Sequence, residues 1–425
     1  MKIIKNPSRD LWNELLKRPA QDVTKLFSTV QGIIDEVVKN GDKALIEYAK
    51  IFDKVELKKL AVTPEEIEEA EKGLDTKLKQ SIELAYQNIA KFHKAQVFAP
   101  IKVETSKGVV CEQRAVAIEK VGLYVPGGTA PLFSTVLMLA APAKIAGCKQ
   151  IILCSPPDKK GKINAAILYA AKICGVTDIY KVGGSQAIAA MAFGTESINK
   201  VDKIYGPGNQ YVMAAKQLVS LGDVAIDMPA GPSEVEVLAD DSCNPAFVAA
   251  DLLSQAEHGA DSQAVLITNS EIVAEEVAKQ VEIQLKKLKR QELIEKSLSH
   301  SLCFVMENMD EAIELTNEYA PEHLVIATKD YHKVCDKIIH AGSIFLGNYS
   351  CESAGDYASG TNHTLPTKGY AKAYSGLCLD SFTRKMTIQE LSAEGIKSIG
   401  ETVATMASGE MLDAHENAMR IRMKK

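Results

Sequence analysis

Hydrophobic residues recur at helical spacing through the first part of the chain. Between Val23 and Val38 the apolar positions lie three or four residues apart, and Asn40-Gly41 closes the run. This spacing predicts an amphipathic helix that ends near residue 40. Thr63-Pro64, followed by two glutamates, is typical of the start of another helix. Residues 1 to about 97 are therefore predicted to be helical.

The pattern changes at Ile101, where two extended runs flank a Lys107-Gly108 turn and predict a pair of strands. Beyond Ile118, short apolar runs alternate with alanine-rich helical segments, and helix returns from Thr387. Such alternation predicts parallel strands joined by crossover helices, so we expect an α/β fold with two similar units. The predicted strands are 121–125, 151–154, 179–182 and 204–205 in the first unit, and 264–268, 303–306, 324–327 and 343–346 in the second, which starts at Glu234.

Composition and charge argue against several classes of function. The 425 residues carry 49 basic and 55 acidic side chains, a net charge of -6, and no long basic run, which disfavours nucleic-acid binding. The longest apolar stretch, residues 136–143, is far shorter than the ~20 residues that span a bilayer. The first residues contain no apolar signal segment, so we expect a cytoplasmic protein with no membrane contact. Nine cysteines without a C-x-x-C pair argue against a disulfide framework and a thiolate zinc site.

Three glycine-rich turns follow predicted strands. They span residues 122–129, 182–186 and 205–211. Turns of this kind let backbone amides approach a phosphate at a helix N-terminus. In the first turn Gly128 stands where a phosphate-binding loop has its lysine, which disfavours ATP hydrolysis. The third has Tyr211 in place of the last dinucleotide glycine, so it is a weak nicotinamide signal, and plain tight turns remain the alternative.

His258 ends a predicted helix that Asn244 and Pro245 open. Gln255 lies one turn earlier on the same face, so its amide oxygen and the His258 imidazole can share one cation. The alternative is a histidine that interacts favourably with the dipole at the helix C-terminus.

Glu322 and His323 directly precede a predicted strand. An imidazole beside a carboxylate suits proton transfer near neutral pH, although neighbours on a strand can also point to opposite faces. Asp356 and His363 lie in a long polar loop over residues 347–369. Asp356 is there either an oxygen ligand for a metal or a turn residue.

A cysteine nucleophile in an aldehyde-oxidising enzyme is a separate hypothesis. Cys111 and Cys154 lie near the glycine turns and are the candidates by position. Both stand in apolar strand patterns, which favours buried and inert thiols.

These segments together resemble the histidinol dehydrogenase family, whose members use zinc and NAD+. Seven stretches match in the family's order, while the N-terminal helical region matches only in general character. They are Gly122-Leu-Tyr-Val-Pro-Gly-Gly-Thr-Ala-Pro-Leu-Phe-Ser134, Tyr205-Gly-Pro-Gly-Asn209, Asp227-Met-Pro-Ala-Gly-Pro-Ser233-Glu, Leu253-Ser-Gln-Ala-Glu-His258-Gly, Tyr319-Ala-Pro-Glu-His-Leu324, Gly355-Asp-Tyr-Ala-Ser-Gly-Thr-Asn-His363-Thr-Leu-Pro366 and Ala414-His-Glu-Asn-Ala418.

The resemblance implies a role for each matching position. The implied Zn2+ ligands are Gln255, His258, Asp356 and His415. The implied catalytic pair is Glu322 and His323, and the implied NAD+ contacts are Tyr124, Gln186 and Asn209. The implied substrate contacts are Ser233, His363 and Glu410, together with His323 and the four metal ligands.

The family's fold implies two incomplete Rossmann-like domains in an aldehyde-dehydrogenase-like architecture, with one Zn2+ per subunit. Residues 1–123 are then N-terminal helices and a β extension packed on the second α/β unit. Residues 124–233 form the first, NAD-contacting α/β domain, and residues 234–376 form the second, with the metal and catalytic residues. Residues 377–425 form a helical arm that is swapped in a homodimer, where His415 reaches the partner subunit's zinc.

The implied reaction is the four-electron oxidation of L-histidinol through L-histidinaldehyde to L-histidine. His323 would accept the alcohol proton and Glu322 would activate the water that attacks the aldehyde, which removes the need for a cysteine nucleophile. One alternative is a relative that acts on a different amino or acidic alcohol, but Glu410 and His363, the residues expected to read the imidazole, match the family. A non-catalytic metal-binding protein is the other alternative, and it would not need the Glu322-His323 pair.

Overall fold

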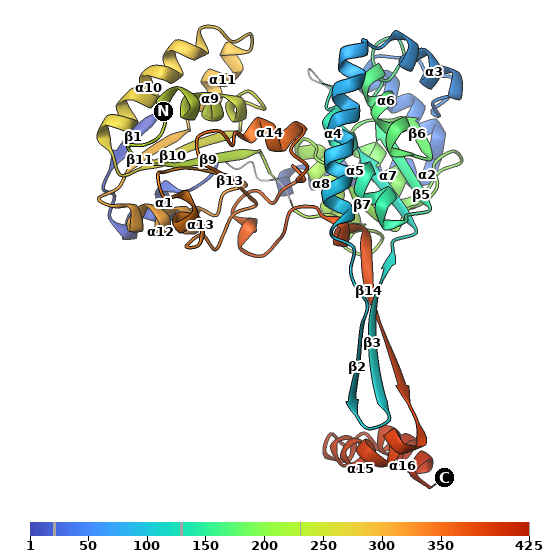
Figure 1. Ribbon diagram of the computed structural model, residues 1–425. Coiled ribbons are helices and arrows are strands. Elements are labelled where there is room, and N and C mark those ends of the chain that lie inside the picture. The colour runs from blue at the N-terminus through green and yellow to red at the C-terminus, as the bar shows by residue number, and fades with distance from the viewer. Residues whose placement is uncertain (20–22, 128–130, 230, 425) are drawn as a thin grey trace.

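The computed structural model describes residues 1–19, 23–127, 131–229 and 231–424. Gly128, which stands at the lysine position of a phosphate-binding loop, lies outside these ranges. Two α/β units lie side by side, and a thin three-stranded arm that carries two helices extends away from one of them (Figure 1).

The first unit is built on a five-stranded parallel sheet. Its order is β6 (Asp178–Lys181), β5 (Gln150–Ser155), β4 (Lys120–Tyr124), β7 (Lys203–Tyr205) and β8 (Ala225–Ile226). The crossover helices are α5 (Phe133–Ala146), α6 (Ala165–Cys174), α7 (Gly184–Phe193) and α8 (Gln210–Ser220). β4, α5 and α7 are buried almost throughout, as expected for a parallel sheet covered on both faces. The first predicted α/β unit is confirmed.

The second unit is built on a six-stranded parallel sheet. Its order is β1 (Lys2–Lys5), β11 (Leu302–Val305), β10 (Gln263–Thr268), β9 (Glu234–Ala239), β12 (His323–Ala327) and β13 (Ser343–Leu346). The helices are α9 (Pro245–Ala256), α10 (Glu271–Leu285), α11 (Gln291–Leu298), α12 (Met309–Tyr319) and α13 (Tyr331–Cys335). The second predicted unit is confirmed with its four strands. The helical prediction is wrong at residues 2–5, which pair with β11.

The N-terminal region divides between the two units. β1 and α1 (Arg9–Leu15) join the second unit, where Trp12 packs into the core. The helices α2 (Phe27–Tyr48), α3 (Pro64–Gly73) and α4 (Thr76–Lys94) instead pack on α7, α6 and α5 of the first unit. From the sequence we expect the whole region on the second unit, but Ile34 and Ile82 complete the core of the first. The predicted break at Asn40-Gly41 is a kink within α2, where Gly41 has a φ of 52°.

Shorter turns connect these elements. A 3-10 turn, η1 (Val23–Leu26), precedes α2, and a π turn, η2 (Ala49–Asp53), follows it. The polar loop of residues 347–369 contains an unpredicted helix, α14 (Glu352–Tyr357), and two 3-10 turns follow, η3 (Tyr370–Lys372) and η4 (Leu379–Phe382). No helix in the described ranges combines the length and the apolar character that crossing a bilayer requires.

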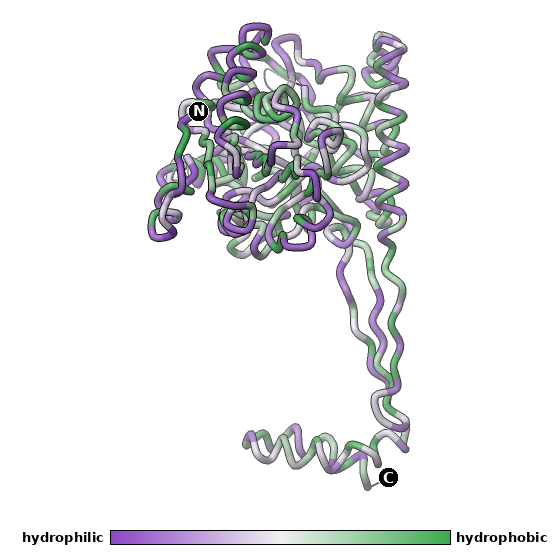
Figure 2. The backbone as a smooth tube through the Cα atoms, turned by 60° about the vertical axis from the view of Figure 1, so that its left-hand side comes forward, coloured by the Kyte–Doolittle hydropathy of each residue, from purple (hydrophilic) through white to green (hydrophobic). Residues whose placement is uncertain are grey.

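The arm consists of an antiparallel sheet that ends in a pair of helices. β2 (Ile101–Ser106) and β3 (Val109–Ala117) are the predicted strand pair, and β14 (Thr383–Leu391) adds to β3. α15 (Ala393–Gly409) and α16 (Asp413–Met423) lie at the far end (Figure 1). The helical prediction from Thr387 is wrong up to Leu391, because pairing with β3 decides the conformation there. Figure 2 shows hydrophobic stretches along the arm, where Ile101, Val103, Met406 and Met411 are exposed.

Candidate active site

One cleft between the two α/β units collects most of the predicted site residues. The first unit contributes Thr135 of α5, the turn at Gly206, and Asp227. The second unit contributes most of the polar wall, namely Ser233, Gln255, His258, Glu322, His323, Asp356 and His363. The predicted metal ligands of the second unit and the predicted acid–base pair therefore meet in one place.

The second unit presents these groups at the edge where its strands begin. Ser233 and Glu322 stand directly before β9 and β12, and His323, the first residue of β12, pairs with Val235 of β9. In a parallel sheet the crossover helices return to this edge, so the end of α9 delivers Gln255 here.

A candidate metal cluster lies where α9 and α14 meet. The side chains of His258, Glu352 and Asp356 offer ligand atoms within 4.8 Å of one another, and His258 Nε2 is 3.8 Å from Asp356 Oδ2. Gln255 is fully buried, and both polar atoms of its amide lack a hydrogen-bond partner in the described structure. A buried amide without a partner is costly, and a bound cation would satisfy its oxygen. Nitrogen and oxygen donors of this kind fit Zn2+.

Glu352 is a site residue that the sequence did not indicate. Its side chain is 1% exposed, and Ser254 Oγ donates a hydrogen bond to Oε2 at 3.3 Å. Burial raises the pKa of Glu352 well above its usual range, and burial also raises the pKa of the neighbouring Asp251 to about 7. The sequence does place Glu352 four residues before Asp356. In a helix this spacing puts both side chains on one face, and this was the pattern that could have indicated Glu352.

Glu322 and His323 lie side by side in the cleft, each 4% exposed. The Glu234 N–H donates to Glu322 Oε2 at 2.8 Å, and the Glu234 carbonyl oxygen is 3.3 Å from His323 Nδ1. His323 Nδ1 is 3.7 Å from Glu322 Oε2, so the alternative with side chains on opposite faces is wrong. His323 Nε2 lies 3.5 Å from Asp356 Oδ1, on the side of the metal cluster.

Buried carboxylates crowd this part of the cleft. Burial raises the pKa of Glu322 to about 8, and the nearby charge of His323 opposes this shift only in part. Burial alone lowers the pKa of His323, but Glu322, Asp356 and Glu352 outweigh it and raise the pKa to about 10. Several carboxyl groups converge on this part of the cleft, and a bound cation would stabilise their ionised forms.

His363 links the cleft to the first unit. Its Nδ1 is 2.9 Å from the Asp356 carbonyl oxygen, and its Nε2 is 3.3 Å from the Thr135 hydroxyl group. Burial lowers the pKa of His363, which favours the neutral imidazole. Thr135 is therefore a second wall residue that the sequence did not indicate.

Asn209 lies beside the cleft, at the start of α8. Its Oδ1 accepts hydrogen bonds from the N–H groups of Tyr211 and Val212, which caps the helix. It also lines a second cleft, whose wall shares Ser233 and His258 with the first. The structure therefore connects this predicted NAD+ contact to the site.

Tyr124 and Gln186 lie deeper in the first unit. Tyr124 ends β4 and is buried, and its hydroxyl accepts a hydrogen bond from the Gly184 N–H at 3.1 Å. Gln186 is buried near the start of α7. Both pack at the edge where the strands of the first sheet end, apart from the walls described for the two clefts.

Glu410 and His415 lie far from this cleft within the chain. Glu410 follows α15 and His415 lies in the first turn of α16, both exposed at the end of the arm (Figure 1). A single chain therefore brings together three of the four predicted metal ligands, Gln255, His258 and Asp356.

The two cysteine candidates do not supply a nucleophile to the cleft. Cys154 is fully buried in β5, and burial raises the pKa of its thiol far above the usual range. Cys111 lies on β3 of the arm. Thiolate chemistry needs an accessible, easily ionised cysteine, and neither residue offers one at this site.

Comparison with known proteins gives consistent matches along the whole chain. The family model described as histidinol dehydrogenase matches residues 16–423. A histidinol dehydrogenase of Bacteroides fragilis is 64% identical over 424 residues, which cover 100% of this chain and 99% of the relative. One of Bacteroides thetaiotaomicron is 63% identical over 423 residues with the same coverage. The crystal structure of histidinol dehydrogenase from Elizabethkingia anophelis is 52% identical, has a TM-score of 0.98, and covers 100% of this chain and 98% of its own.

Proposed function

Because this chain belongs to the histidinol dehydrogenase family and is thus an oxidoreductase of histidine biosynthesis, we propose that its cleft oxidises L-histidinol through L-histidinaldehyde to L-histidine with NAD+. The observation that carries the proposal is the joint presence of a cation-binding cluster and a buried acid–base pair. Asp356 belongs to the cluster and lies 3.5 Å from His323 Nε2.

The metal would be held by Gln255, His258 and Asp356 of one chain. This assignment is supported by the unpartnered Gln255 amide and by the convergence of His258 and Asp356. When bound, Zn2+ would anchor the amine and imidazole nitrogens of the substrate, which stay unchanged while the carbon end is oxidised. Ser233 and His363 would position the substrate in the same cleft.

Glu322 and His323 would carry out the proton transfers. In its neutral form, His323 would take the alcohol proton on Nε2, because Nδ1 faces the Glu234 carbonyl oxygen. The neighbouring carboxylates raise the pKa of His323, and a cation held by Asp356 would offset their charge and so favour the neutral form. Glu322 would activate the water that attacks the aldehyde, and His323 would serve again when the resulting diol is oxidised. NAD+, when bound, would accept one hydride in each oxidation. Burial of the pair limits competition from bulk water.

We place NAD+ in the second cleft, beside Asn209. The walls of the second cleft share Ser233 and His258 with the substrate cleft. The turn at Gly208 leads into α8, and the N-terminus of that helix favours the binding of a phosphate group. Tyr124 and Gln186 are proposed as contacts from the family resemblance. Their burial means that contact with NAD+ requires local movement of the surrounding loops.

We propose a homodimer in which the arm of one chain reaches the cleft of the other. His415 and Glu410 are exposed at the arm's end, where Met406 and Met411 also leave apolar surface uncovered. His415 would then complete the partner's metal site, and Glu410 would contact its substrate. Exposed apolar surface of this kind is typical of an interface.

We further place the protein in the cytoplasm. All nine cysteines are free. Free thiols are typical of a reducing compartment, and NAD+-dependent biosynthesis fits the same location.

Mixing two inactive variants tests the shared site. With the ligand supplied in trans, a heterodimer of His415→Ala and His258→Ala chains has one site with both defects and one with none. Activity should therefore return to about half the wild-type value per heterodimer, by site counting for a symmetric dimer. Subunit exchange is verified with two different affinity tags. A verified heterodimer without activity would contradict the shared site.

Removal of a ligand tests the metal site. His258→Ala should reduce bound zinc from about one ion per chain to a small fraction. The substitution leaves only three of the four proposed protein ligands, and three hold a zinc ion more weakly. His332, exposed on α13, provides the matched control, and His332→Ala should retain its metal. Elemental analysis of the dialysed proteins gives the result. Full zinc occupancy in His258→Ala would overturn the assignment.

A further inference from the structure

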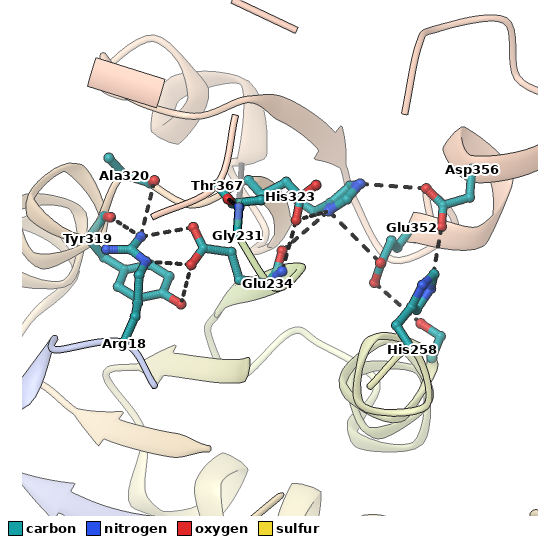
Figure 3. Close-up of polar contacts among 12 residues, drawn as sticks. Arg18, Gly231, Glu234, His258, Tyr319, Ala320, His323, Glu352, Asp356 and Thr367 are labelled. Atoms are coloured by element: carbon teal, nitrogen blue, oxygen red, sulfur yellow. Dashed lines mark hydrogen bonds and ion pairs between the residues drawn. The ribbon is translucent and has the colours of Figure 1, made fainter. Parts of the chain in front are cut away.

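Arg18 lies in the segment that follows α1, on the far side of Glu234 from His323 (Figure 3). Trp12 of α1 anchors this segment in the core of the second unit. The guanidinium group bonds both oxygens of the Glu234 carboxylate, with Nη2 3.0 Å from Oε1. Nη2 also donates to the carbonyl oxygens of Tyr319 and Ala320, and the guanidinium carbon lies 4.0 Å from the centre of the Tyr319 ring (Figure 3).

Glu234 connects this contact to the acid–base pair. The Glu234 side chain is 2% exposed and that of Arg18 is 14% exposed, so the ion pair is shielded from water. The Glu234 N–H donates to Glu322 Oε2, and the Glu234 carbonyl oxygen faces His323 Nδ1. The residue whose carboxylate Arg18 holds therefore holds both members of the pair through its backbone.

Arg18 also contacts the segment that leads into Glu322, through its hydrogen bonds to the carbonyl oxygens of Tyr319 and Ala320. Tyr319 ends α12, and Ala320 and Pro321 lead directly to Glu322. Ala320 has a φ of 51°, a left-handed conformation that is uncommon for a residue with a side chain. Hydrogen bonds from Arg18 stabilise this turn. Arg18 thus joins the start of β9 to the turn before β12.

Arginine suits this task better than other residues. Its planar fork can bind a carboxylate through two N–H groups and still donate to carbonyl oxygens, whereas lysine acts as a point charge. A buried ion pair gives little net stability over an apolar replacement, so its value here is the geometry that it fixes.

We propose that Arg18 is a positioning residue, which holds Glu322 and His323 in their working orientation through Glu234 and the turn at residues 319–320. This inference rests on the proposed acid–base roles of Glu322 and His323. Misplacement of reacting groups by about 1 Å can cost on the order of 100-fold in rate. The zinc ligands of this chain lie on α9, in the turn that follows it and on α14, so metal binding should not depend on Arg18.

The zinc-loaded Arg18→Met variant is compared with the wild type on histidinol and on histidinaldehyde. We expect kcat to fall by roughly 10- to 100-fold for both substrates, with KM for histidinol within about threefold and normal zinc content. Arg18→Lys should give an intermediate kcat, because it keeps the charge without the fork.

The double variant Arg18→Met/Glu234→Gln separates positioning from stability. It removes the buried charge together with its partner, so the melting temperature should recover relative to Arg18→Met. The kcat should stay low, because the bonds to the 319–320 turn are still absent. Arg9→Met is the matched control. Arg9 also links α1 to α12, through an exposed ion pair with Glu314, and its loss should leave kcat unchanged.

Two results would overturn the inference. One is a wild-type kcat in Arg18→Met, and the other is a kcat that recovers with the melting temperature in the double variant, which would make Arg18 a general stabiliser. If Arg18→Met does not fold, Arg18→Lys and the double variant decide by the same criteria. A wild-type enzyme that fails to oxidise histidinol would contradict the proposed function instead.

Discussion

Replacing His323 by asparagine is expected to slow the oxidation of both histidinol and histidinaldehyde by about 10²–10⁴-fold, the usual cost of losing a general base. The same imidazole is proposed to serve both oxidations, and its Nε2 faces Asp356 within the cleft. Asparagine keeps a hydrogen-bonding side chain but cannot exchange a proton near neutral pH. Separate steady-state assays with the alcohol and with the aldehyde measure the two effects.

Zinc content is the control for this variant. His323 lies outside the proposed ligand set, so His323→Asn should bind zinc as the wild type does. His332→Asn, at an exposed position on α13, should retain both zinc and activity. Loss of metal from His323→Asn would show that His323 is a ligand or a structural residue, and the proposed mechanism would then be wrong.

Glu322→Gln is expected to separate the two oxidations. Water activation belongs to the aldehyde step, so that step should slow by about 10²–10⁴-fold while the alcohol step changes far less. The glutamine oxygen can still accept the hydrogen bond that the Glu234 N–H donates to Glu322 at 2.8 Å, so the local geometry should survive. Single-turnover assays of each half-reaction, started from the alcohol or from the aldehyde, resolve the two rates.

The pH dependence of the aldehyde step gives a second criterion. Glu322 must be ionised to act as a base, and burial raises its pKa to about 8. In the wild type the rate should therefore rise with pH through the neutral range, and Glu322→Gln should lose this rise. Equal slowing of both half-reactions, or an unchanged pH profile, would contradict the assignment.

The two parallel sheets could be predicted because apolar strand runs alternate with glycine turns and alanine-rich helices. β1 and β14 could not be predicted in this way. Four residues at β1 are too few to show a period, and β14 is only partly buried. Each forms a strand because a neighbour, β11 or β3, supplies its backbone hydrogen bonds. The docking of α2 on the first unit likewise depends on tertiary contacts that periodicity does not contain.

The candidate site was predictable where its residues share one element. Gln255 and His258 are one turn apart at the end of α9, a spacing that can be read from the sequence. Glu352 was missed because α14 lies inside a polar loop without a helical pattern. Arg18 and Glu234 are 216 positions apart, and no local pattern relates them. The sequence indicates individual candidate residues, and only the fold shows which of them lie close together in space.

The yield of NADH per histidinol tests whether this protein carries out both oxidations of histidinol. The purified, zinc-loaded protein is incubated with excess NAD+ and a limiting, known amount of L-histidinol until the absorbance of NADH is constant, and the product is identified by chromatography. About two NADH are expected for each histidinol, with L-histidine as the product, because one cleft carries out both oxidations. One NADH with free histidinaldehyde, or no NADH at all, would contradict it.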